Sequence, residues 1–484
     1  MKMRLRAGIA IIVLAASASS TFAIGGLDTP PPPASPHEIN FTQPKETTLA
    51  NGLRLIVAER PDLPLLAAEV VVRNGAEIDP PNLAGTASMT GALLTKGTDS
   101  MSAPQIATAI ESLGGDISSG AGWDLSTASV VVMSDKADAA LTILADVVLH
   151  PTFKQDELDR LKKQRLDGLR VALQQPGALA GFVAERVVFE SGEYGHSTGG
   201  TVESVQATQR DDIVKIYKSY YAPANSALIF VGNVTLEQGK AYAQKYFGAW
   251  KADAAVMNAA QPGRTEWKPD NVVVDMPQAG QATVALSKPA IKRNSPDYYS
   301  GLVANAALGN GFISRLNREI RIKRGLSYGA RSSLDARRDT GPFTASAQTK
   351  NESAAEVAKL IMAELKRLAI NPVQGEELKS RQAVLTGGYA RSLETDEGFA
   401  GNLASLAAYN LPLDRLNAFI PKINAVKSED VTAFVTKYLS PPPSLIIVGK
   451  APAFIDPLKK DFPKVKVIAQ PDLDLNRPDL VKQR

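Results

Sequence analysis

Residues 79–98 read DPPNLAGTASMTGALLTKGT and form the most informative stretch of this 484-residue chain. The stretch closes with Lys96-Gly97-Thr98, and the positions before that end are occupied by Ser88, Gly91 and Ala92. Glycine and alanine side chains have no donor atom, and a serine hydroxyl is a poor zinc ligand. These three positions therefore offer no good zinc ligand.

The rest of the chain repeats itself. The Glu-Leu pairs Glu157-Leu158 and Glu377-Leu378 each follow a proline at the start of a charged, helix-like segment. Further along, Leu228-Ile229-Phe230-Val231-Gly232 has a counterpart in Leu445-Ile446-Ile447-Val448-Gly449. A recurring order with a nearly constant offset predicts two homologous halves.

These halves define the predicted domains. We expect an N-terminal domain at 46–250 and a C-terminal domain at 271–470, joined by a Pro-, Gly- and Ala-containing linker at 251–270 and followed by a tail at 471–484. Strand-like and amphipathic helical patterns occur in both halves. The predicted fold class is α+β, with two homologous domains, each a mixed or antiparallel sheet covered by helices. The duplication favours a clamshell with a cavity between the halves.

Several landmarks keep their order and spacing along the chain. They are Gly85, Ala87 and Lys96-Gly97-Thr98, then Asn51-Gly52-Leu53-Arg54-Leu55-Ile56, Tyr194-Gly195 with Gly199-Gly200, Tyr220-Tyr221-Ala222-Pro223-Ala224-Asn225, Ser314-Arg315-Leu316 and Arg324-Gly325-Leu326-Ser327-Tyr328. Together they resemble the insulinase-like (pitrilysin, inverzincin) zinc metallopeptidases, in their processing-peptidase-like branch. The resemblance covers nearly the whole chain after the first segment.

In that family, two histidines one helical turn apart and a downstream glutamate hold zinc, and a glutamate between the histidines acts as general base. The resemblance places the histidines at Ser88 and Ala92, the general base at Gly91 and the third ligand at Gly168. It therefore implies that the zinc motif is lost and that this chain holds no metal or other cofactor. Asp167 could replace the third ligand only if a side chain turned by about 100° around its helix still reached the ion.

The three histidines do not replace the lost ligands. His37 lies in a Pro-rich segment, His150 precedes Pro151 at a predicted helix end, and His196 lies in a Gly-rich turn. No two of them have the spacing of metal ligands, so we do not expect a structural zinc site either.

The C-terminal half retains a second family feature. The resemblance implies that Arg321 and Tyr328, seven residues apart as in active members, are catalytic, because both can donate to a developing oxyanion. We expect Gly325 to end the helix that carries Arg321 and Tyr328 to lie on the following strand. The alternative is structural, with Arg321 in a surface ion pair and Tyr328 in the core.

Two glycine-rich segments match weaker family features. Leu308-Gly309-Asn310-Gly311-Phe312 stands where the non-catalytic subunit of the mitochondrial processing peptidase has a glycine-rich loop, although the segment here is short and such a segment is more often just a turn before a helix. Gly114 to Gly120 stands where the family has a substrate-lining strand with an Asn-Ala pair. That pair is absent here, which weakens the case for peptide binding by the first half.

The composition limits the classes of binding partner and the cellular compartments to be considered. The chain has 54 basic and 50 acidic residues, interspersed along the sequence, so its charge gives no argument for nucleic acid or an anionic membrane. It contains no cysteine, which rules out disulfides and a lipid-modified cysteine anchor.

The N-terminus predicts export. The segment 1–23 has the pattern of a signal peptide: a basic start, the short apolar run Ala7 to Ala18, and small residues up to Ala23. We expect cleavage after Ala23, with Ala16-Ser17-Ala18 as the alternative cleavage site. A Pro-rich linker at 24–45 follows. We expect a periplasmic protein without a membrane anchor.

Three functions remain open. In the first, the chain is a non-zinc-binding subunit. It pairs with a homologous chain that carries the intact zinc motif, and it supplies Arg321 and Tyr328 for peptide hydrolysis. Alternatively, it is an inactive scaffold or peptide-binding protein of the same fold, or an enzyme of altered chemistry. The retained Arg/Tyr pair favours the first function, and the loss of every ligand opposes the third.

Overall fold

The computed structural model describes residues 41–251 and 267–483. The predicted signal peptide, His37, most of the Pro-rich linker and most of the interdomain linker lie outside these residues. Among the described residues, no helix combines the length and the apolar character needed to cross a bilayer.

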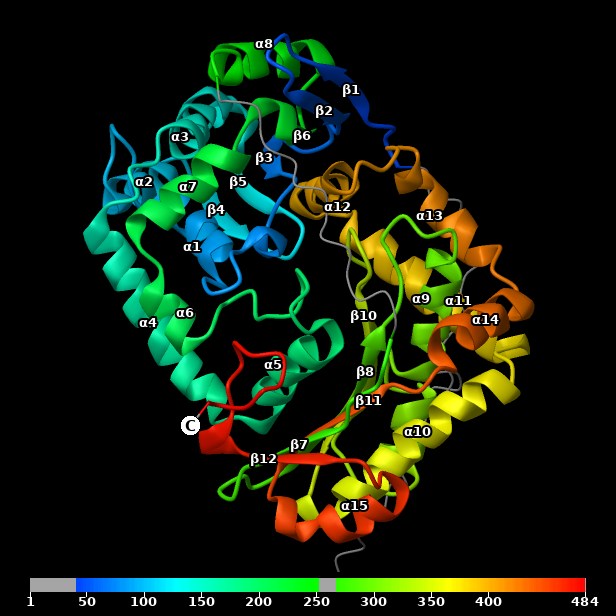
Figure 1. Cartoon of the computed structure of the whole chain (residues 1–484). Coiled ribbons are helices and arrows are strands. Elements are labelled where there is room, and N and C mark those ends of the chain that lie inside the picture. The colour runs from blue at the N-terminus through cyan, green and yellow to red at the C-terminus, as the bar shows by residue number, and fades with distance from the viewer. Residues whose placement is uncertain (1–40, 252–266, 484) are drawn as a thin grey trace, which may run out of the picture. The chain divides into compact units, whose positions relative to one another are not determined.

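Two sheets organise the chain (Figure 1). The first half contains β1 (Lys45–Thr48), β2 (Arg54–Glu59), β3 (Leu65–Val72), α1 (Thr86–Leu93), α2 (Ala103–Ser112), β4 (Asp116–Ala121), β5 (Ser126–Met133), α3 (Ala137–Leu149), α4 (Gln155–Leu173), α5 (Pro176–Phe189), α6 (Val202–Ala207), α7 (Arg210–Tyr220), β6 (Ser226–Gly232) and α8 (Leu236–Phe247). Its strands form one six-stranded sheet in the order β1-β2-β6-β3-β5-β4.

The second half repeats this plan. It contains β7 (Val272–Asp275), β8 (Ala282–Pro289), α9 (Tyr298–Leu308), the π-helix η5 (Asn317–Ile322), β9 (Ala330–Leu334), β10 (Pro342–Thr349), α10 (Ala354–Ile370), α11 (Gly375–Ser392), α12 (Asp396–Ala408), α13 (Arg415–Asn424), α14 (Ser428–Phe434), β11 (Ser444–Gly449), α15 (Ile455–Asp461) and β12 (Lys466–Ala469). Its sheet has the order β12-β7-β11-β8-β10-β9.

The two sheets share their strand directions. β6 lies parallel to β2 and antiparallel to β3, just as β11 lies parallel to β7 and antiparallel to β8. They differ at one edge, where β1 is antiparallel to its neighbour and β12 is parallel. The predicted α+β fold with two mixed sheets covered by helices is confirmed.

Each half covers one face of the other half's sheet. Helix α5 packs Leu179 and Val183 onto β7 and β11 of the second sheet, while α12 packs Phe399 and Leu403 onto β2, β3 and β6 of the first. Both pairs are spaced by four residues and so lie on one helix face. Because this exchange buries apolar area of both halves, the described residues 41–251 and 267–483 belong to one compact unit.

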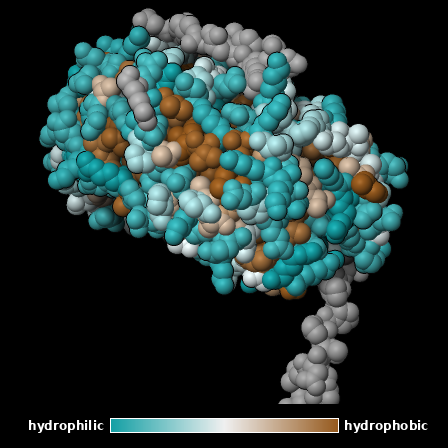
Figure 2. All heavy atoms as spheres, turned by 60° about the horizontal axis from the view of Figure 1, so that its bottom comes forward, coloured by the Kyte–Doolittle hydropathy of each residue, from teal (hydrophilic) through white to brown (hydrophobic). Residues whose placement is uncertain are grey.

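The segment after β12 folds back onto the first half. Leu473, Leu480 and Val481 join the apolar cluster around α5, and the Arg186 side chain donates a hydrogen bond of 2.9 Å to the Leu475 carbonyl. Figure 2 turns the lower end of Figure 1 forward, and apolar atoms gather there in the middle of a largely polar face. The predicted tail is therefore part of the fold as far as residue 483.

Candidate functional site

Helix α1 carries three of the four positions at which the zinc motif is lost. Asp79 accepts hydrogen bonds from the backbone N–H groups of Gly85 at 2.6 Å and Ala87 at 2.7 Å, which satisfies free donors at the start of the helix. Burial raises the pKa of Asp79 to about 8, although these two N–H groups act in the opposite direction. Ser88 and Ala92 are half-buried and one turn apart. The helix geometry of a metal site is thus retained without its ligands.

A guanidinium group contacts the first lost position. The Arg165 side chain on α4 donates a hydrogen bond of 3.0 Å to the Ser88 hydroxyl, and the buried Asp79 carboxyl interacts with the same guanidinium. A fixed positive charge beside Ser88 opposes a divalent cation at this place.

Gly91 is a packing position. A Cβ atom added there would lie 2.6 Å from the backbone carbon of Gly120 and 2.9 Å from the nitrogen of Ala121, on edge strand β4. Such approaches are closer than real Cβ contacts, so any side chain at position 91 would require the strand to move. The helix and the strand meet here through their backbones, and the sequence alone did not indicate this.

The remaining candidates do not complete a metal site. Gly168 is exposed on α4, and Asp167 pairs with Arg170 at 2.7 Å on the surface. His150 is the exposed C-cap of α3, whereas His196 is held by the Ser197 carbonyl at 3.0 Å from its Nδ1. Within residues 41–251 and 267–483, no three His, Cys, Asp or Glu side chains gather closely enough to hold a metal ion. The residues present do not fit zinc.

Rebuilding the motif should therefore fail. We expect the variant Ser88→His, Gly91→Glu, Ala92→His, Gly168→Glu to bind zinc weakly and to show little peptidase activity, because Arg165 and strand β4 occupy the space that the new groups need. Zinc content after dialysis and peptide hydrolysis measure this. Turnover like that of an active family member would show the expectation to be wrong.

A pair of alanine variants tests separately whether an added side chain at position 91 fits. Gly91→Ala should destabilise the fold by about 1–3 kcal/mol through overpacking. The matched control is Gly168→Ala, where an added Cβ meets nothing within 4 Å. It should be neutral or stabilising by up to about 1 kcal/mol, because alanine favours a helix interior over glycine. Urea unfolding of both variants gives the comparison.

Arg321 and Tyr328 lie together in the second half. The Arg321 guanidinium carbon is 4.8 Å from the centre of the Tyr328 ring and 4.6 Å from the centre of the Phe312 ring. Tyr328 is 90% exposed and Phe312 60% exposed, so neither ring fills core. The guanidinium is held between two exposed aromatic rings by cation–π attraction.

The local backbone explains this placement, with one correction. Arg321 lies in the π-helix η5, a form that often occurs at functional sites. Gly325, with φ of +63°, donates its N–H to the Arg321 carbonyl at 3.0 Å and turns the chain away from the helix. The prediction that Tyr328 lies on the following strand is wrong. It stands in the loop before β9, because that strand begins only at Ala330.

Tyr328 lines a groove of about 990 Å³, and Arg321 contacts the rings of two lining residues, Tyr328 and Phe312. One wall is α5 from the first half, and the other is the face of β8, β10 and β9 that also carries Ser346 and Thr344. Gly309, Gly311 and Phe312 of the glycine-rich segment also line it. Phe312 is therefore a residue of the site that spacing alone did not single out, although its aromatic side chain next to two glycines was visible in the sequence.

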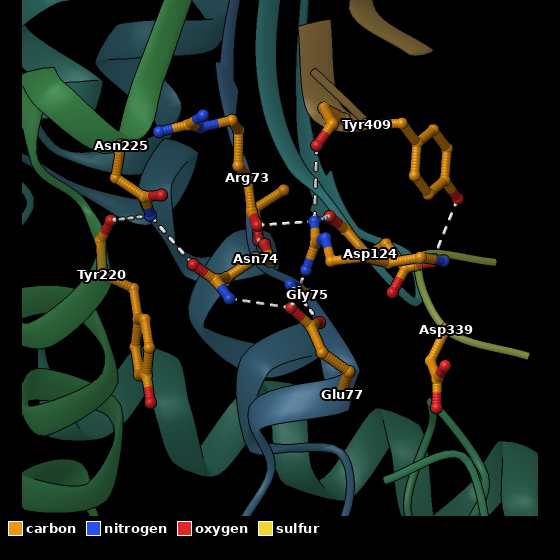
Figure 3. Close-up of polar contacts among 12 residues, drawn as sticks. Arg73, Asn74, Gly75, Glu77, Asp124, Tyr220, Asn225, Asp339 and Tyr409 are labelled. Atoms are coloured by element: carbon orange, nitrogen blue, oxygen red, sulfur yellow. Dashed lines mark hydrogen bonds and ion pairs between the residues drawn. The ribbon is translucent and has the colours of Figure 1, made fainter. Parts of the chain in front are cut away.

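A buried polar network at the turn between β9 and β10 joins the two halves (Figure 3). Arg338, in the turn between β9 and β10, donates to the Glu77 carboxyl at 2.7 Å and to the Arg73 carbonyl at 2.7 Å. Asp124 accepts from the Arg338 backbone N–H at 2.9 Å and from the Tyr409 hydroxyl at 3.0 Å. No sequence motif indicated this network, because its members come from distant segments.

Glu69 provides a separate test of electrostatics. It lies on β3, and its carboxyl has no hydrogen-bond or ion-pair partner among the described residues. Burial raises its pKa to about 7 from 4.5. Because the folded state binds the proton more tightly, this group's stabilisation is full below pH 4.5 and is lost as pH rises through 7.

We therefore expect Glu69→Gln to flatten the pH dependence of unfolding. The variant should match the parent near pH 4 and exceed its free energy of unfolding by about 2–3 kcal/mol at pH 8. Urea titrations at several pH values check this. Equal stability of the two proteins at pH 8 would mean that the carboxyl is solvated in the native state.

The comparisons with known proteins agree with this architecture. The family model "Insulinase (Peptidase family M16)" matches residues 55–180, and the model "Peptidase M16 inactive domain" matches residues 207–385. An uncharacterized zinc protease of Streptomyces coelicolor is 26% identical over 84% of this chain and 89% of its own length. One from Bacillus subtilis is 22% identical over 84% of this chain and 98% of its own length.

Solved structures give the same result. A crystal structure described as a peptidase M16 inactive domain from Pseudomonas fluorescens is similar with a TM-score of 0.78 and 28% identity, over 84% of this chain and 98% of that one. A protease from Helicobacter pylori shares the fold with a TM-score of 0.77 and 20% identity, over 84% of this chain and 100% of that one. With both halves matched and the metal ligands replaced, this chain belongs to the insulinase-like M16 peptidase family as a member that lacks the zinc motif.

Proposed function

We propose that this chain is the non-zinc-binding subunit of an exported, heterodimeric M16 peptidase. It pairs with a homologous chain that carries the intact zinc motif, and it contributes Arg321 and Tyr328 to peptide hydrolysis. The signal peptide predicted at 1–23 supports a periplasmic location for the pair.

One observation carries the proposal. Arg321 is in contact with Tyr328, which lines a groove and is 90% exposed. In the same chain the zinc positions hold a packed glycine and a serine bound by an arginine. Arg321 and Tyr328 are thus retained although the metal ligands are lost. This is expected of a chain whose side chains complete the active site of a partner chain.

The chemistry assigned to the pair is donation. A guanidinium and a phenol can both hydrogen-bond the oxygen of a peptide carbonyl as negative charge develops on it. The two rings beside Arg321 orient the guanidinium without neutralising it, and no carboxylate lies within ion-pair distance of it in the described part of the chain. Its full charge is thus available to a substrate.

Reconstitution tests the proposal. The purified chain alone should retain no stoichiometric zinc and cleave no peptide, whereas mixing it with the zinc-bearing chain should produce chelator-sensitive hydrolysis above that of either chain. The proposal would be contradicted if the purified chain alone held about one tightly bound zinc ion and also cleaved peptides. A stable complex whose hydrolysis equals that of the zinc-bearing chain alone would favour the scaffold function instead.

A further inference from the structure

The groove between α5 and the second sheet has a floor built for an extended chain. Strand pairing places Ala285, Ser346 and Arg331 in one row across β8, β10 and β9. The next row is Ser287, Thr344 and Ser333. Side chains two residues apart on a strand share a face, so both rows line the same surface. Apart from Arg331 the rows contain only small side chains, which leaves room for a peptide backbone. The hydroxyls of Ser287 and Thr344 hydrogen-bond each other at 2.7 Å, so Ser346 and Ser333 are the hydroxyl groups that can hydrogen-bond that backbone.

The wall on α5 is equally small. Gly177, Ala180, Gly181 and Ala184 line the groove on this helix. A Cβ atom added to Gly181 would meet nothing within 4 Å, so the space beside it is open. Thr283 on β8 also lines the groove, and its buried hydroxyl has no hydrogen-bond partner in the structure. A polar atom left without a partner in this position is an independent sign of a polar occupant.

The charge that remains unpaired in the groove is positive. Its acidic lining residue, Glu185, is already paired with the buried guanidinium of Arg337 at 2.8 Å. Arg331 is exposed on the floor, and Arg321 stands beside Tyr328 at the edge. In the part of the chain that the structure describes, neither Arg321 nor Arg331 has a carboxylate within ion-pair distance. The unneutralised guanidinium of Arg331 therefore faces whatever enters, and that of Arg321 lies next to the Tyr328 ring at the edge.

From these features we infer that the groove binds an extended peptide segment that carries aspartate or glutamate side chains. Small walls select an extended backbone, the hydroxyl rows receive its amide groups, and Arg331 pairs with an acidic side chain. The inference rests on the proposed function in taking the occupant to be a peptide, and it adds the class of sequence that the chain prefers. The chain alone contains the whole groove, so binding requires no partner subunit.

Direct binding tests the charge preference. Three fluorescein-labelled peptides of equal length, with the same glycine, serine and alanine residues, carry aspartate, asparagine or lysine at the same positions. Fluorescence polarisation with the full chain should show the aspartate peptide binding best and losing affinity as salt rises. Arg331→Gln should weaken the aspartate peptide by roughly five- to tenfold and leave the asparagine peptide unchanged. The matched control Arg160→Gln removes one positive charge from exposed α4 and should change neither.

A second pair of variants locates the site. Gly181→Leu extends a side chain into the space beside α5, where an added Cβ meets nothing within 4 Å, and should abolish peptide binding while the thermal midpoint is retained. Gly401→Leu makes the same change on α12, where an added Cβ also meets nothing within 4 Å, and should leave binding intact.

Two results would overturn the inference. The first is equal or tighter binding of the asparagine or lysine peptide. The second is binding that survives Gly181→Leu or is lost only in Gly401→Leu. Because these measurements use the chain without its partner, their failure leaves the reconstitution test of the proposed function untouched. Binding as inferred, combined with no gain in hydrolysis on reconstitution, would instead retain the groove and reject the shared active site.

Discussion

Replacing Tyr328 with phenylalanine is expected to lower the turnover of the reconstituted heterodimer roughly 100- to 1000-fold, the usual consequence of removing one donor to a developing oxyanion. The side chain is 90% exposed, and its hydroxyl has no hydrogen-bond partner among the described residues. Its loss should therefore leave the folded chain unchanged. The measurement is kcat for peptide hydrolysis, with size-exclusion chromatography to show that the two chains still assemble.

The control for this variant is Tyr246→Phe on α8. It also removes one hydroxyl, which donates to the Asp138 carbonyl at 2.9 Å far along the chain from the groove. That variant should retain full turnover. Arg321→Ala should match Tyr328→Phe in direction, since the two side chains are in contact. Unaltered turnover in both Tyr328→Phe and Arg321→Ala would leave the scaffold function as the better explanation.

Replacing Arg338 with methionine should cost about 3–5 kcal/mol of unfolding free energy at pH 8, because it removes the cation beside the buried Glu77 carboxylate together with hydrogen bonds to two backbone carbonyls. Since the pKa of Glu77 is about 7, protonation of this carboxyl limits the electrostatic part of the cost at pH 8 to about 1.4 kcal/mol. Arg338 also donates to the carbonyls of Arg73 and Asp124, so the loss removes bonds between the two halves. Urea unfolding measures the effect.

The pH dependence of that loss identifies its cause. Burial raises the pKa of Glu77 to about 7, while Arg338 acts to lower it. Below pH 4.5 the carboxyl is neutral in the folded and unfolded states, and no buried charge is left unpaired. The cost in the variant should therefore be smallest in acid and grow as pH rises through 7. The double variant Arg338→Met, Glu77→Gln should recover part of the stability at pH 8. A cost independent of pH, with no recovery in the double variant, would assign the effect to packing alone.

The repeat and the chemistry of single positions were readable in the sequence. The matching segments at 228–232 and 445–449 became β6 and β11, the equivalent strands of two sheets with the same order. The absence of donor atoms at Gly91 and Ala92 needed no coordinates, because side-chain chemistry belongs to the residue itself. The family resemblance likewise singled out Arg321 and Tyr328 as a pair, and the structure places them in contact.

The surroundings of those positions depended on contacts between distant segments. Gly91 packs against Gly120, Arg165 reaches Ser88, and Arg338 joins two halves through Glu77. None of these contacts leaves a periodic signal, since each depends on where two separate backbones come to lie. The exchange of α5 and α12 between the sheets has the same origin. Local patterns along the chain thus decided the elements, their order and the lost metal chemistry. Only tertiary packing decided that the former zinc positions are sterically and electrostatically closed and that Tyr328 lines an open groove with Arg321 against its ring, because burial and distance are properties of the folded whole.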